Sequence, residues 1–124
     1  MKIQLRSETE IALSHFHRDG FDVGPIDPQL QFGSMQLFMT SIGMCTFSVL
    51  ASYGERLNTS AEEITIVMKW AYAERPYRIA DIDMRIHWPQ LPESRLDAAT
   101  RAAHQCTLHN TLRHELEITA LVEH

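Results

Sequence analysis

The sequence contains little cysteine and no excess of positive charge. Only two cysteines, Cys45 and Cys106, occur in 124 residues, which is too few for a disulfide scaffold. Sixteen acidic residues against eleven basic ones give a formal net charge of -5 with histidine neutral. Nucleic acids and anionic membranes attract basic surfaces, so we expect neither nucleic acid nor a membrane as a partner.

The sequence also lacks an apolar leader at its start. The opening residues "MKIQLRSETE" are polar and typical of a strand rather than of a secretory signal. We therefore expect a cytoplasmic protein, in a compartment where thiols stay reduced unless they do redox work. Hydrophobic residues make up 44% and charged residues 22% of the chain, both ordinary for a globular protein. A single domain over residues 1–124 is the expectation.

One long stretch has no charge at all. No charged residue occurs from Met35 to Tyr53, and Cys45 lies in its middle. The stretch is long enough to cross a bilayer, but hydroxyl and amide side chains spread polarity along it. We predict a buried central helix, with Ser34 as its N-cap and Gly54 as its stop. So short a chain offers little cover for such a helix, which points to a second subunit.

The remaining pattern predicts strands on either side of this helix. Alternation places Ile66, Met68 and Trp70 on one face of a strand, and a short link joins that strand to the next as an antiparallel hairpin. The expected fold is α+β, a mainly antiparallel sheet with a buried central helix and a second amphipathic helix. The predicted elements are strands over residues 2–7, 10–16 and 21–24, a helix over 35–53, strands over 63–72 and 77–88, a helix over 93–106 and a closing strand over 115–124.

Both cysteines fall on predicted helices and face inward by pattern. A buried thiol often acts only as a small hydrophobic side chain. It becomes a nucleophile where a neighbour stabilises the thiolate. The spacing of Cys45 and Cys106 alone leaves both interpretations open.

The residues around each cysteine carry a family resemblance. "MQLFMTSIGMC" and "AATRAAHQCTLHNTL" resemble the two cysteine motifs of the OsmC/Ohr family. The order of helix cysteine, hairpin, second cysteine and last strand is similar too, from about Asp19 to the end of the chain. The resemblance implies an OsmC-like fold and an intertwined homodimer.

The same resemblance implies a function. Characterised members are thiol peroxidases that reduce organic hydroperoxides and respond to oxidative stress without a cofactor. Carried onto this chain, Cys45 is the peroxidatic thiol, Cys106 the resolving thiol, and a dithiol reductant the partner that resets them. An apolar site suits a small apolar hydroperoxide, with Phe38, Met39, Phe47 and Trp70 as candidate lining residues.

The sequence departs from the family pattern where the thiolate is stabilised. Met35 occupies the position of an acidic residue that works with an arginine, and Ser34 replaces the preceding proline. Arg6 on the first strand is the candidate arginine, ahead of Arg18. Two other interpretations therefore stay open: a catalytically weak dimer that binds a small lipophilic ligand in its interface cavity, and a scaffold whose thiols only pack. A cation near Cys45 would distinguish them.

Histidines near the cysteines raise the question of a metal. His15 and His17 are expected on one face of a strand, while His104 and His109 flank Cys106. Neither group has a recognised zinc-ligand spacing, so we expect no metal. A protonated histidine near Cys106 would instead lower the pKa of that thiol.

Overall fold

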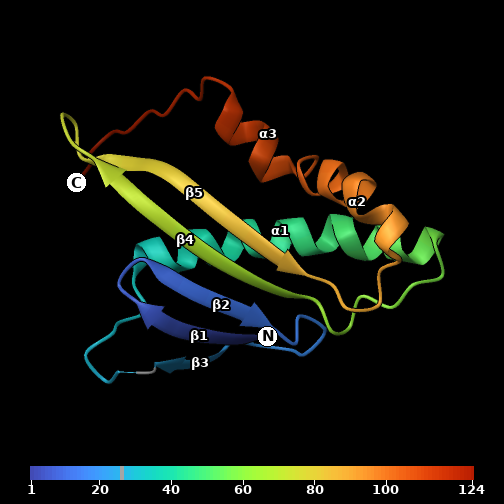
Figure 1. Cartoon of the computed structure of the whole chain (residues 1–124). Helices are drawn as coiled ribbons and strands as arrows, with labels where there is room; N and C mark the ends of the chain where they lie inside the picture. Colours follow the sequence, from blue (N-terminus) through green and yellow to red (C-terminus); the bar gives the residue numbers. More distant parts are fainter. Residues whose placement is uncertain (26) are drawn as a thin grey trace.

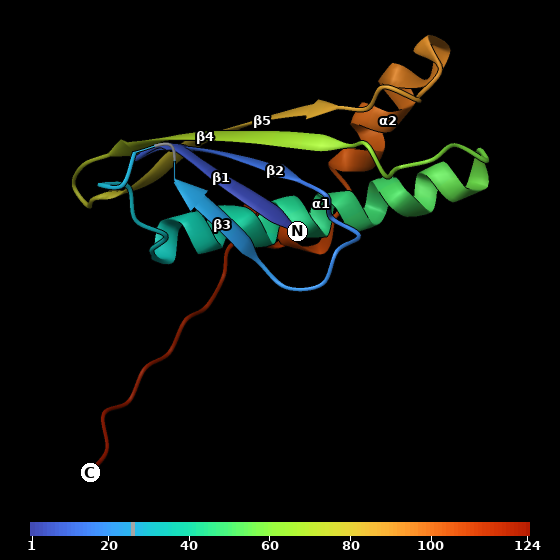
Figure 2. The same ribbon diagram turned by 90° about the horizontal axis from the view of Figure 1, so that it is seen from below.

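A computed structural model describes residues 1–25 and 27–124 and shows one sheet covered on one face by helices (Figure 1). The five strands are ordered β3-β1-β2-β4-β5. The long helix α1 lies across one face of the sheet (Figure 2), and α2 and α3 pack against it. The elements are β1 (Lys2–Ser7), β2 (Glu10–Ser14), β3 (Asp22–Pro25), α1 (Ser34–Arg56), β4 (Thr65–Ala73), β5 (Arg78–His87), a 3-10 turn (Glu93–Arg95), α2 (Leu96–Ala103) and α3 (Thr107–Arg113).

Strand pairing agrees with the expected α+β class. Strands β1 and β2, β2 and β4, and β4 and β5 pair antiparallel, while β3 runs parallel to β1. The β4–β5 hairpin is the longest ladder, from Thr65 opposite His87 to Ala73 opposite Arg78. The mainly antiparallel sheet and the predicted hairpin are therefore confirmed.

The core lies between the sheet and α1. Alternating strand residues point to α1 and are buried, among them Ile3, Leu13 and Met68. A Cβ atom on Gly43 of α1 would collide with Cδ1 of Leu13, so this glycine lets the helix approach β2 closely. The apolar side chains at every second strand position thus pack against one face of the helix.

The ends of α1 differ from the prediction. Gly33, not Ser34, is the N-cap, and its N–H donates to Oε1 of Gln36 over 2.9 Å. The helix continues past Gly54 to Arg56. A Cβ atom on Gly54 would lie 2.7 Å from the carbonyl oxygen of Thr59, so this glycine permits close packing rather than ending the helix.

Helix α1 is long and apolar enough to cross a membrane by length and composition alone. The sheet, α2 and α3 pack against it, as expected of the core helix of a folded domain.

The helix predicted over residues 93–106 is interrupted. Helix α2 ends at Ala103 and α3 begins at Thr107, with Cys106 as the N-cap of α3. The apolar spacing runs through the break, so the pattern alone gave no sign of it. Strand β2 likewise ends at Ser14, and His15 has a φ of 51°. His15 therefore lies in the turn after the strand, and the predicted strand face shared with His17 is wrong.

The closing strand predicted over residues 115–124 does not form within one chain. The segment is extended and pairs with none of the described strands, and it projects from the α1 side of the fold (Figure 2). Ile118 is 81% and Val122 96% exposed. Alternating apolar residues favour a strand in a sheet with one buried face. Within one chain this segment does not reach a sheet edge with which it could pair.

Candidate thiol site

The packing of α1 against α3 brings the two cysteines to one place. Cys45 is half-buried in the middle of α1, and Cys106 is only 1% exposed. The hydroxyl of Thr46, the residue after Cys45, donates to Sγ of Cys106 over 3.8 Å. The thiol of Cys45 lies near enough to raise the pKa of Cys106. Two thiols that are far apart in the sequence thus meet between two helices.

The surroundings of Cys106 favour the protonated thiol. Burial raises the pKa of Cys106, and the neighbouring Cys45 raises it further. The backbone N–H of His109, 3.3 Å from Sγ, and the Thr46 hydroxyl oppose this only in part. No arginine, lysine or histidine side chain is among the groups that shift this pKa within the described chain.

His109 does not supply the missing charge. Burial lowers the pKa of His109, and His104 and Arg113 lower it further, so its imidazole is neutral near pH 7. Its contact with the Cys106 sulfur comes from the backbone rather than the ring.

Arg6 does not join the thiols within one chain. Ile3 and Leu5 of β1 point into the core, so Arg6 lies on the opposite, outer face of the sheet. There its Nε donates to Oε1 of Gln4 over 3.2 Å, and its Nη1 lies 3.5 Å from Oε2 of Glu10. The sequence itself held this information, because the strand alternation that buries Leu5 turns Arg6 outward.

Comparison with known proteins identifies the family of the chain. The family model for OsmC-like protein matches residues 27–120. The chain belongs to the OsmC-like protein family. No curated protein and no solved structure gives a significant match.

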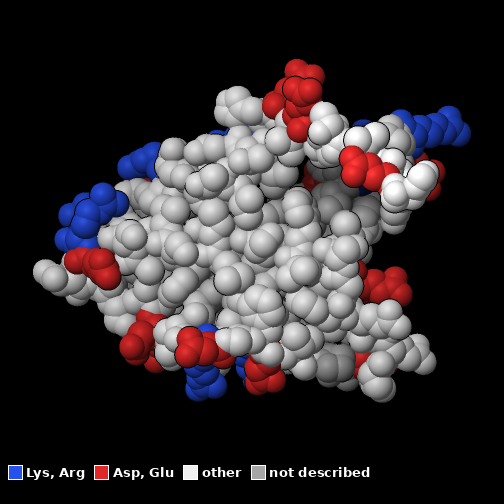
Figure 3. Space-filling model, turned by 180° about the vertical axis from the view of Figure 1, so that it is seen from behind, with Lys and Arg blue, Asp and Glu red and all other residues white. Residues whose placement is uncertain are grey.

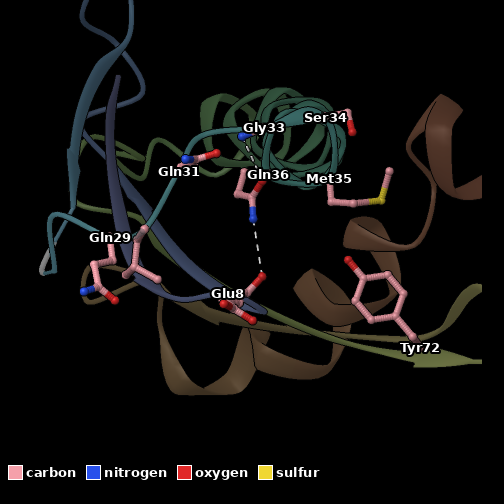
Figure 4. Close-up of a pocket in the computed structure, with 9 residues that line it drawn as sticks. Glu8, Gln29, Gln31, Gly33, Ser34, Met35, Gln36 and Tyr72 are labelled. Atoms are coloured by element: carbon pink, nitrogen blue, oxygen red, sulfur yellow. Dashed lines mark hydrogen bonds between the residues drawn. The ribbon is translucent and has the colours of Figure 1, made fainter.

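The departure of this OsmC-like protein at Met35 is visible at the start of α1. The first turn of α1 contains no acidic residue. Met35 and Tyr72 line a hollow of about 350 Å³, while Nε2 of Gln36 reaches the carbonyl oxygen of Glu8 over 3.3 Å (Figure 4). Met35 precedes Cys45 by ten residues, which is about 15 Å along a helix. Residue 35 is therefore not a neighbour of Cys45 in its own chain.

The four candidate lining residues of this OsmC-like protein do not form a pocket beside Cys106. Met39 and Trp70 are buried in the core, and Phe47 stacks on Phe16 with ring centroids 4.4 Å apart. Phe38 packs half-buried against the core. Of the four, Phe47 also lines a hollow of about 290 Å³ together with Met44, the residue before Cys45.

Sequence reasoning missed a hollow of about 490 Å³ between β5, α1 and the C-terminal helices. Ile42, Ile82, Met84 and Leu112 form its apolar wall, and His104, His109, Arg113 and Asp83 its polar wall. The sequence feature that could have indicated this hollow is the spacing of four residues between His109 and Arg113, which places both side chains on one face of a helix.

Metal ligands do not converge in the part of the OsmC-like protein that the structure describes. No group of three His, Cys, Asp or Glu side chains there has a geometry able to hold a metal ion. His104 and His109 pack edge to face with ring centroids 5.4 Å apart.

Proposed function

We propose that this OsmC-like protein is a cytoplasmic thiol peroxidase that reduces organic hydroperoxides. The observation that supports the proposal is the proximity of two reduced thiols where α1 packs on α3: Thr46, next to Cys45, contacts Sγ of Cys106, and Cys45 itself raises the pKa of Cys106. Cys45 is the half-exposed thiol and Cys106 the buried one. An incoming peroxide therefore meets Cys45 first, which makes Cys45 the peroxidatic and Cys106 the resolving cysteine.

The proposed reaction has three steps. The Cys45 thiolate attacks one peroxide oxygen, the O–O bond breaks, and the other oxygen leaves as an alkoxide that takes a proton to become the alcohol. The Cys106 sulfur then attacks the Cys45 sulfenic acid, forming a disulfide and releasing water. An external dithiol reduces the disulfide by exchange and is itself oxidised. No cofactor enters this scheme.

The same site supports a second candidate function. Arg6 lies on the outer face of the sheet, Met35 replaces an acid, and no cationic side chain shifts the pKa of Cys106. A thiol without a nearby cation is only slightly ionised at neutral pH, so few molecules carry the reactive thiolate. These observations favour a protein with weak turnover that binds a small lipophilic ligand in the hollow beside the thiols.

Steady-state reduction of cumene hydroperoxide by dithiothreitol distinguishes the two functions. The peroxidase proposal expects turnover that Cys45→Ser abolishes. Cys106→Ser is expected to keep the first reduction of peroxide. It cannot form the disulfide that protects the Cys45 sulfenic acid, so further peroxide oxidises Cys45 to the sulfinic acid. Arg6→Gln is expected to retain wild-type turnover, because Arg6 contacts Gln4 and Glu10 instead of the thiols. Equal rates for wild type and Cys45→Ser would favour the ligand-binding function.

A homodimer is the second part of the proposal. The face of the molecule that carries α1 has a broad centre without charge, and charged side chains lie around its edge (Figure 3). On this helix Leu37 is 48% and Met44 41% exposed. An apolar helix face of this kind calls for cover, and a second copy supplies an equal apolar face across a two-fold axis.

The C-terminal segment supports the same partner. Residues 115–124 leave the body on the α1 side and have apolar residues at alternate positions, including Leu116 and Ile118. The outer edges of β3 and β5 are free of strand partners in the described chain. Addition of this segment to a sheet edge of a second copy would satisfy its backbone and bury its apolar side chains.

Light scattering during size-exclusion chromatography tests the dimer. The wild type is expected to have twice the chain mass of 14.3 kDa. Ile118→Asp is expected to shift the protein to monomer, whereas Glu117→Gln, which changes the neighbouring residue of the same segment, is expected to leave the dimer intact. A wild-type monomer at micromolar concentration, or an unshifted Ile118→Asp dimer, would contradict this use of the segment.

A further inference from the structure

The hollow beside the thiols has one apolar wall and one polar wall. Ile42 of α1, Ile82 and Met84 of β5, and Leu112 of α3 form the apolar wall. Its volume of about 490 Å³ is that of a small-molecule site. Ile82 is 36% and Leu112 48% exposed, so the hollow opens to solvent at these two side chains.

The polar wall is organised around Arg113. Nη2 of Arg113 lies 2.7 Å from Nδ1 of His104. A guanidinium has only donors, so Nδ1 of His104 accepts and its ring proton is on Nε2. His104 in turn packs edge to face on His109. Burial lowers the pKa of His109, and His104 and Arg113 lower it further. Arg113 is the one arginine or lysine on this wall, and a guanidinium stays charged over the whole working pH range.

Arg113 has no acidic partner in the part of the chain that the structure describes, although the protein is acidic overall. Asp83 also lines the hollow, but its carboxylate pairs with Nε of Arg85 at 3.0 Å. Arg113 uses one nitrogen on His104 and keeps other N–H donors available. A planar guanidinium of this kind recognises a carboxylate through two parallel hydrogen bonds.

The hollow borders the cysteine pair. The backbone of His109, one of its lining residues, donates to Sγ of Cys106 over 3.3 Å. Ile42 precedes Cys45 by three residues on α1, which places the two on neighbouring positions of one helix face. Neither cysteine lines the hollow, so a molecule along its apolar wall is separated from the thiols by Ile42 and His109.

We propose that this hollow binds an amphipathic monocarboxylate, with its carboxylate on Arg113 and its apolar body along Ile42, Ile82, Met84 and Leu112. Charge complementarity selects the carboxylate, because Arg113 is the one unpaired cation on the wall. The site itself needs no redox chemistry. Binding of an apolar body in the hollow rests on the second candidate function, and use of the hollow as a substrate site, for a hydroperoxide that carries a carboxylate, rests on the peroxidase proposal.

Fluorescence titration of a protein without thiols tests the site alone. The Cys45→Ser, Cys106→Ser double variant is titrated with dansylaminoundecanoic acid and with the alcohol of the same chain. The carboxylate is expected to bind at least about tenfold more tightly, the magnitude of one hydrogen bond to a charged group. Arg113→Gln in this background is expected to remove the difference, and Arg113→Lys to keep part of it.

Arg101→Gln is the matched control, because Arg101 is an exposed arginine of α2 outside the hollow. It is expected to leave both affinities unchanged. Equal binding of acid and alcohol, binding of neither, or a preference that survives Arg113→Gln would each overturn the proposal. Because no peroxide is present, these outcomes are independent of turnover. The carboxylate site can be absent while the wild type still reduces hydroperoxide, and it can be present in a protein that has no turnover.

Discussion

The hydroxyl of Thr46 on α1 donates to Sγ of Cys106 at the start of α3 over 3.8 Å. Both groups are buried, so the contact connects the two helices at the point where the thiols meet. It also lowers the pKa of Cys106 against the larger effect of burial. The residue beside one cysteine thus tunes the other.

Thr46→Val removes this donor and keeps the side-chain shape. The pKa of Cys106 should rise further, and the alkylation rate of Cys106 at pH 8 in a Cys45→Ser background should fall about two- to tenfold, the magnitude of one hydrogen bond. Thr40→Val is the control, since Thr40 is equally buried but donates to the carbonyl oxygen of Gln36 over 2.7 Å. Equal slowing in both variants would show that packing, not the sulfur contact, sets the rate.

The reactivity of the two thiols should differ with pH. Burial raises the pKa of Cys106, so Cys106 stays protonated at neutral pH and its alkylation by iodoacetamide accelerates only as the pH rises past the ordinary thiol range. A raised pKa in the folded state also means that this group's contribution to stability is full below the unfolded pKa. That contribution is lost as the pH rises through the folded pKa.

Intact mass of the single-cysteine variants measures this order. Cys45, the half-exposed thiol, should be modified before Cys106 at pH 7.5, a pH chosen about one unit below the usual thiol pKa. Faster modification of Cys106 at that pH would contradict the assigned environment of its sulfur.

The close packing at Gly54 gives a test of the fold. A Cβ atom there would lie 2.7 Å from the Thr59 carbonyl oxygen and 3.0 Å from the Trp88 ring. Gly54→Ala should therefore lower the free energy of unfolding by about 1–3 kcal/mol, as overpacking does. Gly24→Ala meets nothing within 4 Å and serves as the control in urea unfolding. An unchanged midpoint for Gly54→Ala would contradict the packing of the end of α1.

Local patterns predicted the elements better than their connections. Alternation of Ile66, Met68 and Trp70 was enough for the β4–β5 hairpin, because a period of two reads directly as one buried face. The break before α3 was not predictable in the same way. The apolar spacing continues through it, and a cysteine at an N-cap is not among the usual capping signals.

The site required tertiary information for a different reason. Cys45 and Cys106 were candidates from the sequence, but their contact depends on how α3 packs on α1. Arg113 was overlooked because its charge matters only through His104 and the wall of β5, which no local pattern connects. Residues 115–124 have a strand pattern that one chain does not use, since pairing depends on an edge outside it.

The proposed function predicts that peroxide joins the two sulfurs, and intact mass after one equivalent of cumene hydroperoxide measures this directly. The reduced protein should lose two hydrogens within the mixing time, peptide mapping should show a Cys45–Cys106 bond, and Cys45→Ser should abolish the change. A wild-type chain that keeps its mass, or that gains oxygen on Cys45 without forming the bond, would contradict the account.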